Sequence, residues 1–454
     1  MLRKAFLVLG VSAALAVLTC AGAGQAAVPL AVTISSPQMV APGKVGFEVA
    51  ITGLRPELAP TIEGRATVGG RSFQGPAAPV PAARIPAAID LPSGKVRVGG
   101  DASVVDFTPI PRIEENTPIT LEITVRQASD VATGRQTGVL LLPTVIVPGY
   151  LNDLGGKSAP GIIGLLEQRG YHATAGPPDL FWFSYRSRAL GLKDAARTLA
   201  AYVRDVVLQK TYATRINVVG FSLGGLLVRW NLAFEPGWDH LVNRFVMVGV
   251  PNQGAVAPYV YAWYAIGSLA RTAAAHDLLP TFPFWQATRY SSWRFPPDGH
   301  NETLAELNSH PLPEGIRVYA FYGNQAQLDP HDRGTWAGVI GDLRDVQHAE
   351  FSSGPGDGLV LSASALGLPI NGGAGIPGFP ERLVMKTDLG AVSHLSLMQV
   401  AGTKIADALT DRQAAARPEP VEGQRWRQRP EAAPTNHRGF FIGGMGFLSG
   451  GGRR

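Results

Sequence analysis

The sequence places one serine in a setting that would make it a nucleophile. Ser222 is the central residue of Gly220-Phe-Ser-Leu-Gly224, which matches the G-x-S-x-G nucleophile elbow. The motif follows an apolar run at 216–219 and precedes an apolar segment that starts at Leu223, so a strand, a sharp turn and a helix are expected. Such a turn lifts the hydroxyl above the sheet edge and directs a helix N-terminus at a developing oxyanion. The alternative is a glycine-rich turn with a solvated serine.

A nucleophilic serine needs a base and an acid that orients the base, and with this elbow they follow in the order serine, acid, histidine. His394 is the expected base because it follows the last strand-like segment, 383–386; a surface histidine that caps a helix is the alternative. Asp357 is the expected acid because flanking glycines would let its loop reach the imidazole, although Asp-Gly is also common in ordinary turns. Asp329 is its main rival. The weaker competitors are His276, His300, His310, His331, His348, Asp332, Asp342 and Asp345.

The expected oxyanion hole consists of main-chain donors. They are the backbone N–H groups of Leu223 and of Tyr150, which lies in the loop after a buried strand at 144–147. The sequence contains no nucleotide-binding loop, metal-ligand cluster or glycosidase signature, so neither a cofactor nor a metal is expected.

Strand-like and helix-like segments alternate from residue 139 to residue 411, which is typical of an α/β fold with a doubly wound, mainly parallel sheet. Strands are expected at 144–147, 180–185, 216–219, 245–248, 318–321 and 383–386. Helices are expected at 162–169, 192–206 and 223–234. Before this region, residues 28–138 alternate apolar and polar residues without a helical stripe, notably at 45–52 and 119–126, which predicts a small all-β, Ig-like sandwich.

The two ends of the chain carry its basic charge. The net charge is +5, but residues 412–454 hold eight arginines and three glutamates, which leaves the body without a basic patch for nucleic acid. This basic tail is expected to be disordered. Residues 1–27 are typical of an export signal, with a charged start, an apolar stretch at 5–18 and small residues after it, so a secreted or periplasmic protein is expected. The less favoured alternative is a lipoprotein anchored through Cys20.

An insertion rich in aromatic residues indicates the substrate class. Ten of the 41 residues at 255–295 are aromatic, against 8% for the chain. They are Tyr259, Tyr261, Trp263, Tyr264, Phe282, Phe284, Trp285, Tyr290, Trp293 and Phe295. We interpret 255–309 as a lid, with Tyr150, Tyr259 and Trp263 contacting a hydrophobic ester and with transient contact to a lipid surface. The alternative is a helical cap that packs a small core of its own.

Five ordered segments resemble the secreted lipase and lecithin:cholesterol acyltransferase-like group of α/β-hydrolases. They are Val147-Pro-Gly-Tyr150, Val219-Gly-Phe-Ser-Leu-Gly-Gly225-Leu-Leu-Val-Arg229, Val250-Pro-Asn-Gln-Gly254, Gly356-Asp-Gly358 and Ser393-His394. The resemblance covers 139–411, implies an α/β-hydrolase sheet, and puts Ser222, Asp357 and His394 at triad positions. The sequence departs from the group at Phe221, where histidine is usual, and at Leu359, where threonine is usual.

Together these observations predict an exported serine hydrolase that cleaves carboxylic esters in the manner of a lipase. Ser222 would attack the acyl carbonyl, His394 would carry the proton, and Asp357 would orient the imidazole. An acyltransferase with an alcohol acceptor would use the same acyl-enzyme and is the nearest alternative. A third alternative is a non-catalytic protein that binds an envelope partner through its β domain. The oligomeric state is not indicated.

Overall fold

The structure is a computed structural model of the chain. It describes residues 28–74, 77–92, 95–98, 104–106, 109, 111–150, 159–173, 178–187, 189–255, 272–282, 286–287, 292–293, 301–324, 355–370 and 372–410. All of them belong to one compact unit, residues 1–414. The predicted export signal, most of the aromatic insertion and the basic tail lie outside these residues. In the part of the chain that is described, no helix is long and apolar enough to cross a membrane.

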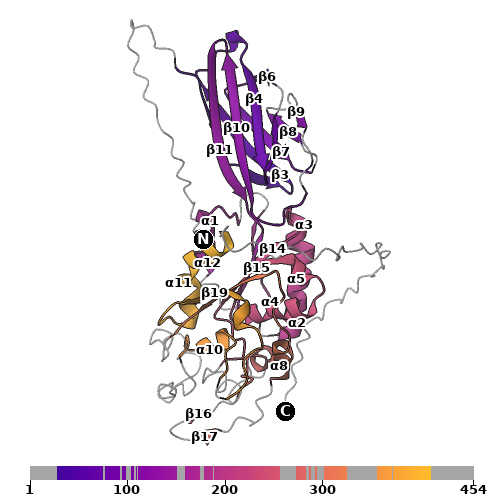
Figure 1. Cartoon of the computed structure of the whole chain (residues 1–454), viewed down its shortest axis with the longest axis vertical. Coiled ribbons are helices and arrows are strands. Elements are labelled where there is room, and N and C mark those ends of the chain that lie inside the picture. The colour runs from indigo at the N-terminus through magenta and orange to yellow at the C-terminus, as the bar shows by residue number, and fades with distance from the viewer. Residues whose placement is uncertain are drawn as a thin grey trace, which may run out of the picture. The chain divides into compact units, whose positions relative to one another are not determined.

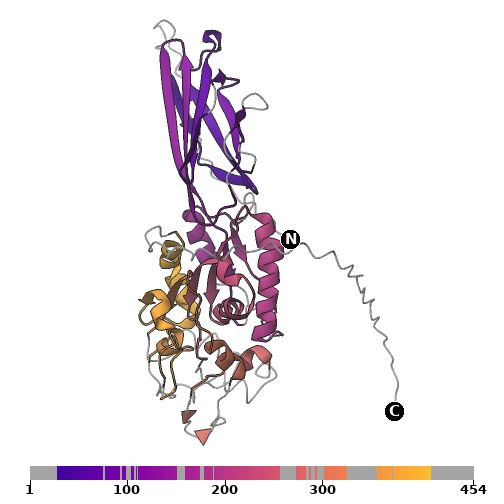
Figure 2. The ribbon, with the colours of Figure 1, turned by 45° about the vertical axis from the view of Figure 1, so that its right-hand side comes forward.

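Two antiparallel sheets form the N-terminal region (Figure 2). The first contains β1 (Ala31–Ile34), β2 (Gln38–Ala41), β3 (Lys44–Thr52), β7 (Arg84–Asp90), β8 (Lys95–Val98) and β9 (Val104–Asp106). The second contains β4 (Thr61–Val68), β5 (Arg71–Gln74), β6 (Ala78–Pro79), β10 (Thr117–Gln127) and β11 (Asp130–Leu140). Alternate residues of β3 and β10, such as Val45, Val49, Leu121 and Val125, enter one shared core. The strands at 45–52 and 119–126 therefore form where alternation predicts them, whereas an Ig-like relationship stays a prediction.

A parallel sheet of six strands follows. Its strands are β12 (Thr144–Val147), β13 (Leu180–Trp182), β14 (Ile216–Phe221), β15 (Val242–Val248), β18 (Arg317–Tyr322) and β19 (Leu383–Asp388). Their order is β13-β12-β14-β15-β18-β19, and every neighbouring pair is parallel. The chain passes from β12 to β13 on one side and then returns to place β14 on the other side of β12. The winding direction thus reverses between β12 and β14.

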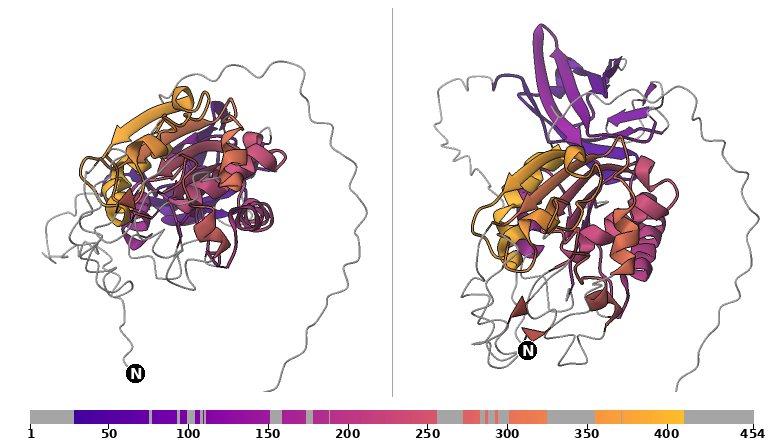
Figure 3. Two further views of the ribbon diagram at one scale, coloured as in Figure 1. Left: turned by 90° about the horizontal axis from the view of Figure 1, so that it is seen from below. Right: turned by 60° about the horizontal axis from the view of Figure 1, so that its bottom comes forward.

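Helices cover both faces of the parallel sheet (Figures 1 and 3). One face packs against α2 (Leu192–Tyr202) and α4 (Leu223–Phe234), and the other against α1 (Ala159–Gln168), α11 (Leu397–Val400) and α12 (Gly402–Thr410). Side chains alternate between these two cores, since Val145 and Val218 face α2 and α4 while Ile146 and Val219 face α1 and α12. Burial on both faces explains why these strands are uninterrupted apolar runs. The shorter helices are α3 (Leu208–Lys210), α5 (Trp238–Leu241), α7 (Ala273–His276), α8 (Glu302–Asn308) and α10 (Ser362–Ala365).

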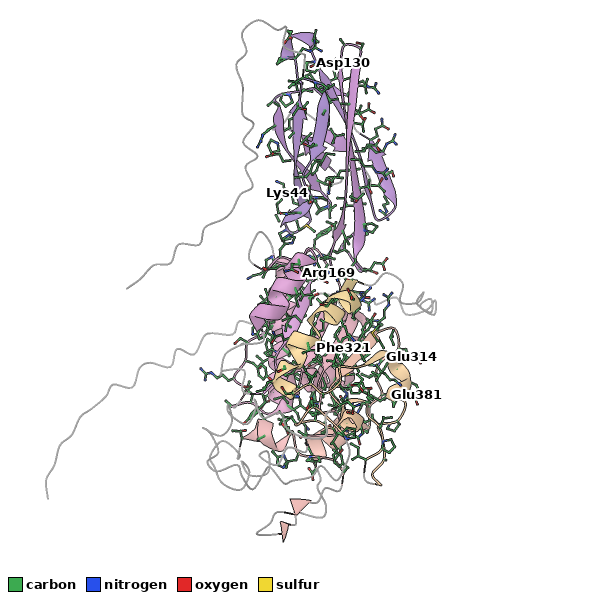
Figure 4. The ribbon with its side chains drawn as sticks, turned by 90° about the vertical axis from the view of Figure 1, so that its left-hand side faces the viewer. Lys44, Asp130, Arg169, Glu314, Phe321 and Glu381 are labelled. Atoms are coloured by element: carbon green, nitrogen blue, oxygen red, sulfur yellow. The ribbon has the colours of Figure 1, made fainter. Side chains whose placement is uncertain are left out.

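Figure 4 shows how side chains divide between this interior and the surface. Phe321 of β18 is buried in the core against α11 and α12, whereas Glu314 and Glu381 are exposed. Arg169 follows α1 and pairs with Asp407 of α12 at an N···O distance of 2.9 Å. Because both partners of this ion pair are substantially exposed, it contributes little stability, and apolar packing between the helices contributes more.

Two elements end well before the residues predicted for their ends. The helix expected at 192–206 changes after α2 into a π-helical turn at Val203–Val207, which keeps both of its terminal valines buried. The strand expected at 180–185 is paired as β13 only to Trp182. Beyond it, Phe183 still donates its N–H to the Ile146 carbonyl at 2.9 Å, but no strand pairing continues past this residue.

We predict that Tyr171 makes the fold sensitive to alkaline pH. Burial raises the pKa of this phenol to about 12. Unfolded tyrosine ionises near pH 10, so between roughly pH 10 and 12 the unfolded chain loses a proton that the folded chain keeps, and stability falls. Tyr171→Phe should remove a component of roughly 2 kcal/mol from this fall. Urea unfolding at pH 9 and pH 11.5 measures it, and equal losses in both proteins would contradict the prediction.

Candidate active site

The carboxyl ends of neighbouring strands meet at one edge of the parallel sheet. Gly149 follows β12, Ser222 follows β14, Gly249 follows β15 and Gly323 follows β18, while the loop after β19 leads to His394. In a doubly wound sheet, a crevice forms outside the carboxyl ends at the point where the winding reverses. That point lies between β12 and β14, so Ser222 is at the position where such a crevice is expected.

Ser222 occupies a strained backbone conformation, with φ 52° and ψ −128°. A non-glycine residue in this region costs about 1–3 kcal/mol and is held there by its surroundings. Its N–H donates to the Val248 carbonyl of the adjacent strand at 2.9 Å, and α4 begins at the next residue, Leu223. The predicted strand, sharp turn and helix are therefore present, and the Ser222 side chain lies at the bend between them.

Glycines allow the chain to close tightly around this bend. A Cβ on Gly220 would lie 2.6 Å from the Gly225 Cα, and one on Gly224 would lie 2.5 Å from the Pro148 carbonyl oxygen. A Cβ on Gly149 would lie 2.7 Å from the Ser222 Cβ. Because no real Cβ tolerates such distances, these positions need glycine. The loop after β12 consequently packs directly against the serine.

The two predicted oxyanion donors lie on either side of this contact. Leu223 is the first residue of α4, whose first N–H groups have no acceptor within the helix. Tyr150 follows Gly149, and its hydroxyl hydrogen bonds to Thr272 Oγ1 at 3.1 Å. The Tyr185 hydroxyl donates to the Pro148 carbonyl at 3.2 Å. Two tyrosine side chains thus hold the loop that carries the Tyr150 N–H.

Asp357 and His394 form a buried pair. His394 Nδ1 lies 2.7 Å from Asp357 Oδ2, and only 4% of His394 and 2% of Asp357 is exposed. Asp357 Oδ1 accepts the backbone N–H groups of Leu359 and Val360, at 3.0 and 2.8 Å. The backbone N–H of His394 also donates to the backbone carbonyl of Asp357 at 2.9 Å. These contacts place the imidazole proton on Nδ1 and leave Nε2 as the acceptor nitrogen.

Phe221 and Gly249 bring the imidazole next to the elbow. The Phe221 and His394 rings stack with centroids 4.9 Å apart and planes 29° apart. A Cβ on Gly249 would lie 3.1 Å from both His394 Cε1 and Asp357 Oδ2. Among the described atoms, no hydrogen bond joins Ser222 Oγ to His394. Such catalytic hydrogen bonds often tighten only in the complex with substrate.

The sequence-predicted residues thus fall into two groups. Ser222, Leu223, Tyr150, Asp357 and His394 come together at one edge of the sheet, and their catalytic roles stay predictions. The rival acid Asp329 and the proposed contact residues Tyr259 and Trp263 lie outside the described residues.

Four supporting residues escaped the sequence analysis. They are Gly249, Gly323, Tyr185 and Thr272. Gly249 directly follows the strand predicted at 245–248, and Gly323 comes two residues after the one predicted at 318–321, so this spacing was a usable signal for close packing at the sheet edge. The tyrosine and threonine contacts cross the chain at long range and leave no mark in the local sequence.

Part of the aromatic insertion is anchored to the body. Asp277 Oδ2 accepts the Leu192 N–H at the start of α2, at 2.6 Å. Asn301 donates to the carbonyls of Asp277 and Leu279, at 2.8 and 3.0 Å, and its Oδ1 accepts the Leu304 N–H at the start of α8. Residues 272–282 and 301–308 therefore form one hydrogen-bonded unit that packs beside α2 and α4.

A buried arginine connects α4, the helix that follows Ser222, to neighbouring elements. Arg229 of α4 donates to the side-chain oxygens of Asn252 and Asn308, both at 3.1 Å, and its guanidinium lies 4.8 Å from the Phe379 ring centroid. Complete burial lowers the pKa of this guanidinium to about 9. Asn252 in turn donates to the Ala365 carbonyl of α10 at 2.7 Å. Arg229 thus connects α4 to the loop after β15 and to α8.

This chain resembles several solved structures, but it matches no family model and no curated sequence. One similar solved structure is a gene product from Listeria innocua, with a TM-score of 0.34, 13% identity, and coverage of 60% of this chain and 95% of that one. A metagenomic carboxyl esterase has a TM-score of 0.35 and 15% identity, and the match covers 64% of this chain and 81% of that one. An esterase from Pyrococcus furiosus has a TM-score of 0.30 and 11% identity, with coverage of 65% of this chain and 87% of that one. At these values the likeness carries no argument about activity.

Among the residues that the structure describes, no group of three or more histidine, cysteine, aspartate or glutamate residues could hold a metal ion. The chemistry available at the sheet edge is that of a hydroxyl, an imidazole, a carboxylate and two main-chain amides.

We predict that Gly249→Ala impairs the site with little effect on the rest of the fold. The added methyl would press on Leu397, Asp357 and His394 at a residue whose φ is 56°. Since a 1 Å misplacement costs roughly 100-fold in rate, a smaller shift of the imidazole should lower kcat/KM by about tenfold. Gly378→Ala is the matched control, since its φ is 66° and nothing lies within 4 Å of the added Cβ. Ester turnover and thermal unfolding of both variants measure the effect, and equal activity in the two would contradict it.

Proposed function

We propose that this chain is an exported α/β-hydrolase that cleaves carboxylic esters through an acyl-enzyme. The observation that carries the proposal is the buried Asp357–His394 pair, with its 2.7 Å contact, beside the strained elbow of Ser222. Supporting observations are the parallel sheet that reverses its winding at this point and the two main-chain amides next to the serine. Export is proposed from the composition of residues 1–27.

The proposed reaction uses each group once in each half. His394 Nε2 takes the proton of the Ser222 hydroxyl while Oγ attacks the acyl carbonyl, and the N–H groups of Leu223 and Tyr150 stabilise the resulting oxyanion. The imidazolium then gives its proton to the departing alkoxide, which leaves as the alcohol. Water attacks the acyl-enzyme by the same sequence and releases the acid. Asp357 keeps the imidazole in the required tautomer throughout.

A hydrophobic ester is the proposed substrate class, on the composition of the aromatic insertion. Small apolar clusters lie where the described part of the insertion meets the Asp357 loop. One contains Ala255, Val360 and Ala365, and another contains Phe282, Leu361 and Ile370. Phe282 is buried in this packing, as a cap would require. The proposal therefore combines a packed cap at 272–282 with substrate contacts by other rings, Tyr259 and Trp263 among them.

The first test concerns the triad. Ser222→Ala should abolish turnover of a chromogenic ester and labelling by a fluorophosphonate, because only the nucleophile is removed. His394→Ala should come within about tenfold of that background, since triad members act as a unit. Asp357→Asn should leave measurable activity, and Asp329→Asn serves as its matched control. Turnover retained in Ser222→Ala would refute the proposal, and a larger loss in Asp329→Asn would reassign the acid.

The second test concerns the substrate and its presentation. The rate should rise with acyl length, and it should rise steeply as a sparingly soluble ester passes its solubility limit, because aromatic rings gain about 25 cal/mol for each Å² buried against lipid. Removing Tyr259 and Trp263 together by alanine substitution should flatten that rise. Simple saturation in both proteins would identify an esterase for soluble substrates. Formation of a new ester when an alcohol is added would instead identify an acyltransferase.

A further inference from the structure

The residue before the candidate nucleophile contacts the candidate base. Phe221 ends β14, and its ring stacks on His394 at a centroid distance of 4.9 Å and an interplanar angle of 29°. The ring is partly buried and packs in the core that also contains Leu397 and Met398. One side chain therefore adjoins Ser222 through the backbone and His394 through its ring face.

The His394 imidazole has three described neighbours, each at a different part of the ring. Asp357 occupies Nδ1, Gly249 leaves just enough room beside Cε1, and Phe221 covers a face of the ring. Asp357 is an ionisable group in contact with the imidazole, whereas Phe221, which ends β14, and Gly249, which follows β15, bring no charge. Among these described contacts, a protonated imidazole would meet one carboxylate and one aromatic face.

An aromatic face has a specific effect on a neighbouring cation. The ring quadrupole attracts positive charge within about 6 Å of the centroid, and the attraction grows when water is excluded. His394 is buried, so the effect acts in a weakly screened setting. An aliphatic side chain of similar size would exclude water equally well but would offer no such attraction.

We propose that Phe221 is a positioning residue that fixes the plane of the His394 imidazole and stabilises its protonated form during catalysis. This inference rests on the proposed function. In each half-reaction, a proton moves from an attacking hydroxyl to Nε2 and then to a leaving oxygen, and the imidazolium exists between these transfers. Phe221 contacts the ring during that interval and takes no part in bond making or breaking.

The direct test measures the protonation of His394 without turnover. In a Ser222→Ala background with histidine labelled at Cε1, the His394 resonance is assigned as the one lost in His394→Ala. Phe221→Leu should lower the pKa of His394 by about half a unit, because it removes the aromatic face and keeps the apolar cover. Phe221→Tyr should restore the parent value. Phe221→Met provides a second, unbranched variant if the leucine disturbs packing.

The kinetic test follows the same variants with Ser222 present. The acid limb of kcat/KM against pH should move down by about half a unit in Phe221→Leu, and the plateau should fall about threefold, with KM nearly unchanged. Phe234→Leu is the matched control. Its ring lies 4.4 Å from His310 in an edge-on contact on the far end of α4, so the acid limb should not move.

Each outcome decides one of the two proposals. A His394 pKa in Phe221→Leu and Phe221→Met within about 0.1 unit of the parent would overturn the role of Phe221, and it would leave only packing. Failure of the protein with Ser222 intact to react with a fluorophosphonate would overturn the proposed function. The titration in the Ser222→Ala background would still show whether Phe221 acts on the imidazole.

Discussion

The backbone of Ser222 imposes the constraint on which the rest of the site depends. A non-glycine residue at φ 52° persists only if its neighbours exclude every relaxed alternative. Here the hydrogen bond to Val248 fixes one side of the bend, and the close approach of Gly149 fixes the other. The parallel sheet and its two helical layers supply the rigidity that keeps these neighbours in place. The hydroxyl is therefore oriented by packing that extends well beyond the site.

Two charged side chains, Asp357 and Arg229, are buried near α4, and their charges are stabilised in different ways. The buried carboxylate of Asp357 contacts two backbone N–H groups and an imidazole, and these hydrogen bonds stabilise its negative charge. Arg229 enters the interior with two neutral asparagine oxygens and an aromatic ring instead. Burial of its charge therefore costs desolvation free energy. The contacts by which Arg229 joins α4, the loop after β15 and α8 must offset this cost. The contacts of Asp357 hold a carboxylate against an imidazole, whereas the contacts of Arg229 hold neighbouring elements of the fold together.

The local sequence predicts most of this architecture because the decisive signals are local. Continuous apolar runs mark the strands of the parallel sheet, and the glycines at 220 and 224 mark the bend before α4, which spans the residues expected for it. Flanking glycines also point to Asp357, and its contact with His394 agrees with the expected pairing. The bonds of Tyr185 to Pro148 and of Tyr150 to Thr272 were not predictable, because each depends on where two distant segments meet in space. The π-helical turn after α2 was missed because its valines keep a helical spacing.

The bonds of Asp277 and Asn301 have a consequence for how this protein can change. They tie residues 272–282 to the start of α2 and to α8, so this segment has anchors of its own in the body of the protein. Evolution, or an engineer, can therefore change the sequence elsewhere in the insertion while these bonds keep residues 272–282 packed beside α2 and α4.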